Sequence, residues 1–306
     1  MAKMDVADRD IGVTVTLDYD IKGEGTPVVQ LHGLTSSRFR DRRLGLDFIE
    51  AIDGHRLIRY DARGHGRSTG PAIPAAYVWP RLAGDLLALL NRVAPGERVH
   101  AVGKSMGVGT VLHAALRHPE RFASLVLVIP PTAWATRLAQ HDNYLRNADL
   151  IEKRGMDYWA SLDRRLPYPP AVNPDRPFTL PDVEERILPS LYRGAAETDL
   201  PSPSDLAGLK VPTLILGWID DPSHPLSTSY KLRDLLPDVR MQVARTPADV
   251  RTWSERMAEH ITAVEARRPV RAGVTVPRVA VDRKAAERRK PVAAGGNVQE
   301  LRRRSA

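Results

Sequence analysis

The sequence of 306 residues contains no cysteine and no long apolar run. Without cysteine it has no thiol nucleophile, no thiolate zinc site and no disulfide framework. Its longest apolar run, about Leu125 to Ile129, is far shorter than the roughly 18 residues that a membrane-spanning helix needs. The first ten residues carry acidic side chains where a signal peptide needs an apolar stretch. We therefore expect a cytoplasmic protein with no membrane partner.

Charge is distributed unevenly along the chain. Residues 265–306 carry twelve Lys or Arg and four acidic residues, a net charge of +8, whereas residues 1–264 carry 33 of each sign. The segment 265–306 also lacks Phe, Trp and Tyr, so it cannot bury a core, and we expect a disordered tail. Because it offers no aromatic platform for bases, we expect no nucleic-acid partner. Residues 1–264 are long enough for one large domain.

Short β-rich runs alternate with amphipathic helical patterns along residues 1–264. Such alternation is typical of a mostly parallel sheet with helices on both faces, an α/β fold. The alternation breaks at about residues 131–205, where aromatic residues and the proline cluster Pro167–Pro170 indicate a helical insertion. The strand-like runs lie at residues 13–17, 27–31, 56–60, 99–103, 124–128, 213–217 and 240–244.

The sharpest motif is a Gly-x-Ser-x-Gly at residues 103–107, between a predicted strand and a predicted helix. In that context the motif is typical of a nucleophile elbow, whose glycines let the chain turn sharply and leave the Ser105 hydroxyl above the sheet. The N-terminus of the following helix offers free N–H groups to a developing oxyanion. The structural alternative is a tight turn with a capping serine.

Two further motifs precede the elbow. His32-Gly33-Leu34 ends one strand, and Asp61-Ala-Arg-Gly-His-Gly-Arg-Ser68 follows the next. With these three motifs in order, the sequence from about residue 12 to residue 264 resembles the α/β-hydrolase superfamily, specifically its capped members. The resemblance implies an eight-stranded, mostly parallel sheet flanked by helices, with a lid inserted after the sixth strand at about residues 131–205. It also implies acyl-transfer or related hydrolytic chemistry.

The resemblance carries over to particular residues. It implies an oxyanion hole built from the backbone N–H groups of Leu34 and Met106, and structural roles for His32 and His65. Family members place the triad acid after the strand at 213–217, just before a Pro-x-x-Pro-like turn. Here that favours Asp221, with Asp220 as the alternative. The acid would fix the tautomer of the base and stabilise its imidazolium, although an Asp-Pro turn also occurs without catalysis.

The histidine base is missing from its family position, a Gly-His after the eighth strand. Residues 245–253 contain no histidine, and His260 lies about a dozen residues beyond the expected place, too far along a helix. Three side chains offer a replacement: His224 in the loop after Asp221, His141 in the lid, and Lys104 as a Ser–Lys variant. Without one of them the triad is incomplete.

These observations predict a serine hydrolase whose partner is a small-molecule substrate, a largely apolar ester or lactone. Ser105 would be the nucleophile, Asp221 the acid and His224 the substitute base. The sequence indicates no metal and no organic cofactor. The alternative is a catalytically impaired member of the fold, used for ligand binding or protein interaction.

Overall fold

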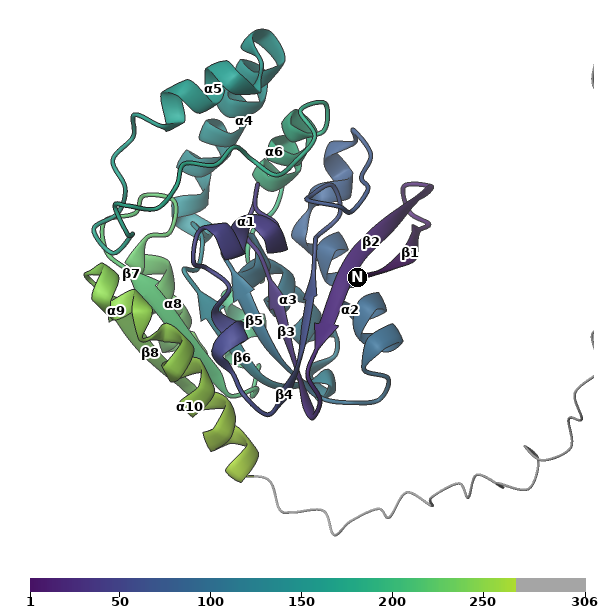
Figure 1. Ribbon diagram of the computed structural model, residues 1–306, viewed down its shortest axis with the longest axis vertical. Helices are drawn as coiled ribbons and strands as arrows, with labels where there is room; N and C mark the ends of the chain where they lie inside the picture. The colour runs from purple at the N-terminus through teal and green to yellow at the C-terminus, as the bar shows by residue number, and fades with distance from the viewer. Residues whose placement is uncertain (268–306) are drawn as a thin grey trace, which may run out of the picture. The chain divides into compact units, whose positions relative to one another are not determined.

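A mostly parallel sheet of eight strands forms the centre of the described chain (Figure 1). This computed structural model describes residues 1–267, apart from the side chains of residues 50 and 51. The strand order is β1-β2-β4-β3-β5-β6-β7-β8; β2 runs antiparallel to both neighbours and the other pairs are parallel. The predicted α/β sheet is thereby confirmed. The strands span β1 Ala2–Asp8, β2 Val13–Lys22, β3 Thr26–Leu31, β4 His55–Tyr60, β5 Val99–Lys104, β6 Phe122–Val128, β7 Thr213–Trp218 and β8 Val239–Ala244.

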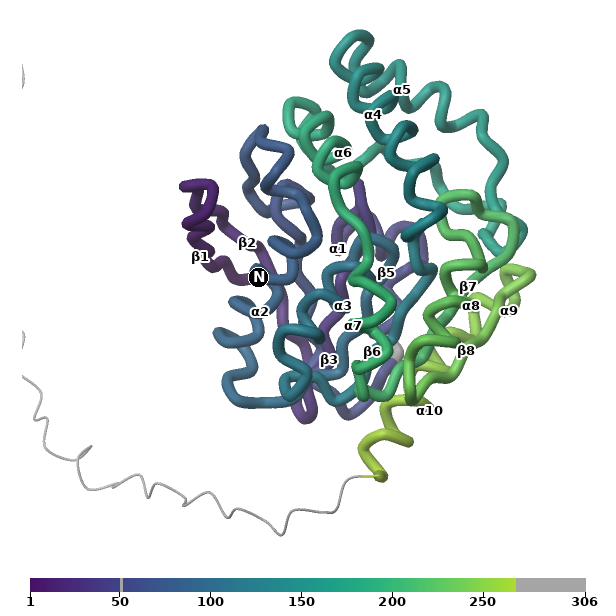
Figure 2. The backbone as a smooth tube through the Cα atoms, turned by 180° about the vertical axis from the view of Figure 1, so that it is seen from behind, coloured from purple at the N-terminus to yellow at the C-terminus, as the bar shows by residue number. Residues whose placement is uncertain are grey.

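Apolar side chains of the central strands alternate between two helical layers, because successive residues of a strand point to opposite faces. Val29 and Leu31 belong to the cluster that includes α2, α3 and α8, whereas Val28 belongs to the cluster that includes α10. Both faces of the sheet are therefore buried, as its short apolar strands predict. Figures 1 and 2 show the two layers from opposite sides. The helices of these layers are α2 Trp79–Val93, α3 Met106–Arg117, α7 Pro203–Ala207, α8 Leu226–Leu235, α9 Pro247–Arg251 and α10 Trp253–Ala266.

The segment inserted between β6 and β7 is helical. It contains α4 (Arg137–Arg154), α5 (Met156–Asp163) and α6 (Leu188–Ala196), and we refer to residues 131–205 as the cap. The cap meets the loops that follow β3 and β4, because Asp182 N–H donates to the Thr35 carbonyl and Gly66 N–H donates to the Asp182 carbonyl. It therefore lies over the carboxyl ends of the central strands.

A buried arginine anchors the cap to the body of the protein. The Arg137 guanidinium donates to the Thr198 carbonyl at 2.8 Å and to the Ala195 carbonyl, and lies 4.5 Å from the Trp79 ring centroid. The backbone N–H of Trp134 adds a bond to the Asp199 carboxylate at 2.9 Å. These contacts join the first turn of α4 both to the end of the cap and to α2.

The C-terminal boundary lies close to the predicted one. α10 continues to Ala266, two residues beyond the predicted end of the domain at residue 264. The sequence analysis predicts a disordered tail at residues 265–306. Of this segment, residues 268–306 lie outside the described residues. Within residues 1–267, no helix combines the length and the apolar character needed to cross a membrane.

Arg63, from the second sequence motif, forms a buried ion pair that ties the loop after β4 to α2. Its guanidinium donates to both oxygens of Asp85 at 2.6 Å, and the two residues are 1% and 2% exposed. A second carboxylate, Asp8 of β1, accepts at 2.9 Å. Removing Asp85 would leave the buried guanidinium with Asp8 as its one carboxylate partner and with two donors unpaired.

We therefore expect Asp85→Ala to lower the free energy of unfolding by about 1.5–3 kcal/mol, the range for hydrogen bonds to a charged group. The control is Asp10→Ala, which removes an 82% exposed carboxylate from Arg81 and should cost less than about 1 kcal/mol. Urea denaturation followed by circular dichroism measures both. Equal losses in the two variants would contradict a structural role for the buried pair.

Candidate active site

Ser105 stands at a sharp turn between β5 and α3. Its backbone has φ 51° and ψ −110°, a conformation that non-glycine residues rarely adopt. The turn is held by two hydrogen bonds: Ser105 N–H donates to the Val128 carbonyl at 3.0 Å, and Val108 N–H donates to the Ser105 carbonyl at 2.8 Å. This strained strand-to-helix turn is the geometry that the Gly-x-Ser-x-Gly motif predicts.

The two glycines of the motif permit this turn because other backbone segments pass very close to them. A Cβ atom on Gly103 would lie 2.4 Å from the Gly107 carbonyl oxygen, and one on Gly107 would lie 2.8 Å from the Leu31 carbonyl oxygen. Any side chain at either position would push α3 away from the ends of β5 and β3.

His224 completes a chain of hydrogen bonds with Ser105 and Asp221. Its Nε2 atom lies 2.8 Å from Ser105 Oγ, and its Nδ1 atom lies 2.7 Å from Asp221 Oδ2. Because a carboxylate only accepts, Nδ1 carries the proton that is donated to Asp221, and Nε2 is left to accept from the serine hydroxyl. A base in this tautomer can remove the Ser105 proton.

The acid and the base share one short loop after β7. Ser223 N–H donates to Asp221 Oδ1 at 2.9 Å, and His224 N–H donates to the Asp221 carbonyl at 3.1 Å. This local turn folds the chain back on itself and directs the imidazole toward Ser105. The Trp218 indole also donates to Asp221 Oδ2, at 2.8 Å.

These donors keep the Asp221 carboxylate charged. Burial alone would raise the pKa of Asp221, but the charge and hydrogen bond of His224, with the donors from Trp218 and Ser223, outweigh burial and lower the pKa to about 2. The histidine thus faces a fixed negative charge.

The other candidate residues do not join this chain. The carboxylate bonded to His224 belongs to Asp221 and not to Asp220. Lys104 is buried, with Nζ 2.5 Å from Asp41 Oδ1, and His141 pairs with its neighbour Asp142. His260 lies buried in α10, where burial lowers its pKa to about 4. Of the three replacement bases that the sequence offers, the structure brings His224 to Ser105.

The predicted oxyanion donors lie beside the nucleophile. Met106 is the first residue of α3, where a backbone N–H has no acceptor within the helix. The loop that contains Leu34 passes close by, because a Cβ on Gly33 would lie 3.4 Å from Ser105 Cβ. Both N–H groups therefore belong to segments that border the Ser105 side chain.

His32 and His65 hold this loop in place. His32 Nδ1–H donates to the Gly33 carbonyl at 2.8 Å, while Nε2 accepts from Ala62 N–H at 2.9 Å. The His65 ring lies 4.9 Å away from the His32 ring, and burial lowers the pKa of both, that of His65 to about 3. Two neutral rings thus link the loops after β3 and β4. Within residues 1–267, no group of three or more His, Asp or Glu residues could hold a metal ion.

Residues 26–249 match the model of a family described as the alpha/beta hydrolase fold. Because the match covers most of the chain, the protein belongs to this family. The eight-stranded, mostly parallel sheet described above is the fold that the family resemblance implies.

Individual relatives extend the comparison. RutD of Variovorax paradoxus, named for a proposed carbamate hydrolase activity, is 30% identical over 236 residues, which are 74% of this chain and 86% of the relative. An esterase from Thermogutta terrifontis has a TM-score of 0.69 at 22% identity, covering 86% of this chain and 99% of its own. The enol-lactonase from Burkholderia xenovorans LB400 has a TM-score of 0.66 at 21% identity, covering 81% and 97%. At these identities the two structures show a shared fold.

The close approach at the elbow generates a stability prediction. Gly107→Ala places a methyl group against Leu31, so we expect a loss of about 1–3 kcal/mol in the free energy of unfolding. Gly84→Ala is the matched control, because Gly84 lies inside α2 with nothing within 4 Å of its Cβ position. That variant should gain up to about 1 kcal/mol from helix propensity. A loss at Gly84 as large as that at Gly107 would contradict the packing argument.

The charged state of Asp221 generates a pH prediction. Its pKa is about 2 in the folded protein against an ordinary 3.8, so its contribution to stability is present above about pH 4 and is lost as pH falls toward 2. The shift corresponds to about 2 kcal/mol. We expect Asp221→Asn to be less stable than the wild type at about pH 6, with a smaller difference at about pH 3. Urea denaturation at both pH values tests this, and a constant difference would contradict it.

Proposed function

We propose that this protein is a serine hydrolase that cleaves a small ester or lactone. The observation that supports this most directly is the hydrogen-bonded chain from Ser105 Oγ through His224 to Asp221, with distances of 2.8 and 2.7 Å. The chain supplies a nucleophile, a base and an acid in the order that acyl transfer needs. His224 therefore takes the role left open by the absence of a histidine after β8.

The proposed reaction starts with attack on the substrate carbonyl. His224 Nε2 removes the Ser105 proton as Oγ bonds to the carbonyl carbon, and the carbonyl oxygen becomes an oxyanion. The backbone N–H groups of Leu34 and Met106 donate to that oxyanion, aided by the positive end of the α3 dipole. Asp221 stabilises the imidazolium that forms.

The remaining steps use the same groups in reverse. The imidazolium of His224 gives its proton to the leaving oxygen, the bond to the leaving alcohol breaks, and an ester with Ser105 remains. Water, deprotonated by His224, then attacks that ester. The bond between the acyl carbon and Ser105 Oγ breaks, the imidazolium returns the proton to Oγ, and the acid product leaves. In a lactone the leaving oxygen stays attached to the acyl chain.

The relatives support the reaction class without fixing the substrate. RutD is named for carbamates, and the two solved structures are named as an esterase and an enol-lactonase. All three names describe the cleavage of a carbonyl compound that bears an oxygen or nitrogen leaving group. We choose an ester or lactone because an oxygen leaving group needs less protonation by His224 than a nitrogen leaving group does.

The triad makes a kinetic prediction for hydrolysis of p-nitrophenyl butyrate. Ser105→Ala and His224→Ala should each lower kcat by about 10⁴-fold or more, and the double variant should lose little beyond that, because the residues act as a unit. His141→Ala, which removes an imidazole from the cap, is the control and should keep wild-type activity. Folding of each variant is checked by circular dichroism.

Two results would overturn the proposal. Unchanged activity in His224→Ala would exclude His224 as the base. A wild type with no turnover above that of Ser105→Ala would instead favour the alternative, a member of the fold that binds ligands without catalysis.

A further inference from the structure

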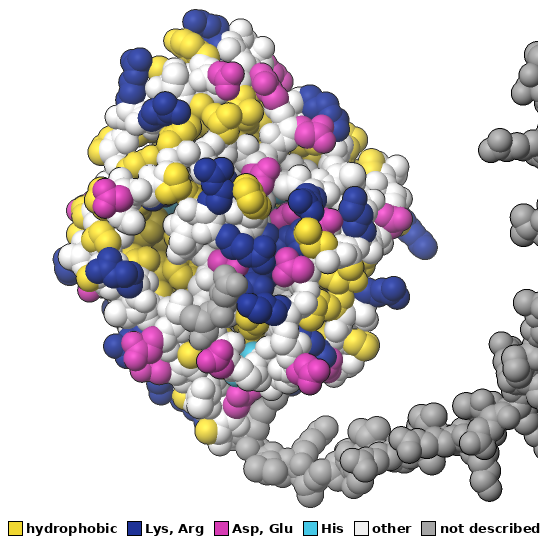
Figure 3. Space-filling view, in the orientation of Figure 1, with side chains coloured by type: hydrophobic (Ala, Val, Ile, Leu, Met, Phe, Trp, Pro, Cys, Tyr) yellow, Lys and Arg dark blue, Asp and Glu magenta, His cyan; other side chains and the backbone are white. Residues whose placement is uncertain are grey.

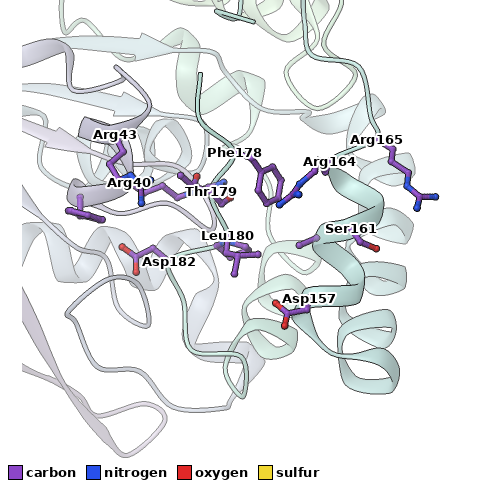
Figure 4. A pocket seen from close by; sticks show the side chains of 13 residues that line it. Arg40, Arg43, Asp157, Ser161, Arg164, Arg165, Phe178, Thr179, Leu180 and Asp182 are labelled. Atoms are coloured by element: carbon purple, nitrogen blue, oxygen red, sulfur yellow. Dashed lines mark hydrogen bonds between the residues drawn. The ribbon is translucent and has the colours of Figure 1, made fainter. Parts of the chain in front are cut away.

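A pocket lies beside the loop that follows β3. It has a volume of about 880 Å³ and is bounded by α1 (Arg38–Arg43), by α5 of the cap and by residues 178–182 (Figure 4). Neither Ser105 nor His224 lines it. We refer to it as the α1–α5 pocket.

The wall of the α1–α5 pocket directly contacts the loop after β3, which contains Leu34 and Thr35. Arg40 donates to the carbonyl and hydroxyl oxygens of Thr35 at 3.3 Å, and Asp182 N–H donates to the same carbonyl at 2.9 Å. Thr35 follows Leu34, whose N–H is a proposed oxyanion donor. The pocket wall is therefore bonded to the residue that follows this proposed donor.

Positive charge predominates in the lining. Four arginines line the pocket against two carboxylates, and one of these, Asp182, accepts from the Ser37 hydroxyl. Within residues 1–267, none of the four arginines forms an ion pair with an acidic side chain. Figure 3 shows Lys and Arg side chains gathered over α1 on the face drawn. The four arginines are Arg40, Arg43, Arg164 and Arg165.

Arg40 is the most enclosed of these cations. Its Nε donates to Thr179 Oγ1 at 2.8 Å and its Nη2 to the Thr179 carbonyl at 3.1 Å, so its partners there are neutral. Burial lowers its pKa, only partly opposed by the nearby Asp41. All three nitrogens of Arg40 already donate to Thr35 and Thr179, so Arg40 adds positive charge to the pocket, while the exposed Arg43 and Arg164 present their guanidinium donors to an anion.

Apolar groups stand between the arginines. The Arg164 guanidinium carbon lies 4.2 Å from the Phe178 ring centroid, while Leu180 is 41% exposed. Figure 4 shows Arg40 and Arg164 on opposite sides, with Phe178 between them. Such a lining suits a ligand that joins an anionic group to a short hydrocarbon chain or ring.

We propose that the α1–α5 pocket binds a carboxylate of the substrate, so that the ester or lactone cleaved at Ser105 is itself an anion. This inference rests on the proposed function and narrows its substrate class. It changes the expectation of a largely apolar substrate in one respect: the acyl part carries a charge at the end remote from the reacting carbonyl.

Two esters that differ only at that end test the proposal. Mono-p-nitrophenyl glutarate carries a carboxylate where p-nitrophenyl pentanoate carries a methyl group. We expect wild-type kcat/KM to favour the glutarate by about tenfold, the value of one charge-assisted hydrogen bond. The double variant Arg43→Gln/Arg164→Gln should abolish this preference, measured as the ratio of the two kcat/KM values.

Arg146→Gln is the matched control. Arg146 is an exposed arginine of α4 that does not line the pocket, so this variant has the same charge change per residue and should keep the preference. A wild type that does not favour the glutarate, a double variant that keeps the preference, or an equal loss in Arg146→Gln would each overturn the pocket assignment.

Binding without turnover separates this inference from the proposed function. Ser105→Ala protein is titrated calorimetrically with benzoate and with its neutral analogue benzamide. We expect benzoate to bind about tenfold more tightly, and the added Arg43→Gln/Arg164→Gln changes to remove that difference. Equal affinities for benzoate and benzamide would overturn the anion site even if both esters are hydrolysed. If neither ester is hydrolysed, the proposed function fails and this titration alone decides the pocket.

Discussion

The geometry of the site depends on the sharp turn at Ser105. The chain can hold φ 51° there because Gly103 and Gly107 have no side chains where the backbone segments touch. The same closeness brings the first N–H of α3 and the loop after β3 to the serine hydroxyl. The proposed nucleophilic attack and oxyanion binding both depend on this turn at the end of β5.

The second constraint is a short turn that carries both acid and base. In Asp221-Pro-Ser-His224 the carboxylate binds a backbone N–H of its own loop and the imidazole three residues later. The segment after β8, where the family histidine is expected, instead begins α9 with Thr246 and Asp249 in a capping box. The proposed base thus belongs to the same short loop as its acid.

Sequence reasoning predicted the parts of the site that follow from local pattern. The strand–glycine–serine–glycine–helix pattern predicts Ser105 as the nucleophile. The family resemblance, together with the proline that follows, favours Asp221 over Asp220 as the acid. Sequence reasoning left His224 as one of three replacements, because distance along the chain does not reveal that Ser223 and His224 fold back onto Asp221. The spacing Asp-x-Ser-His indicates such a turn, because an Asp side chain commonly accepts a hydrogen bond from the backbone N–H two residues later. The α1–α5 pocket joins α1 to α5 and residues 178–182 across more than a hundred residues, so no local pattern predicts it.

The proposed mechanism requires that His224 activates Ser105. The most direct measurement is the rate at which a fluorophosphonate modifies the protein, with the modified residue located by peptide mass spectrometry. The role of His224 as the base predicts that wild-type protein is modified at Ser105, and that His224→Gln reacts at least about 100-fold more slowly because the serine keeps its proton. Modification of both proteins at Ser105 with the same rate would contradict it.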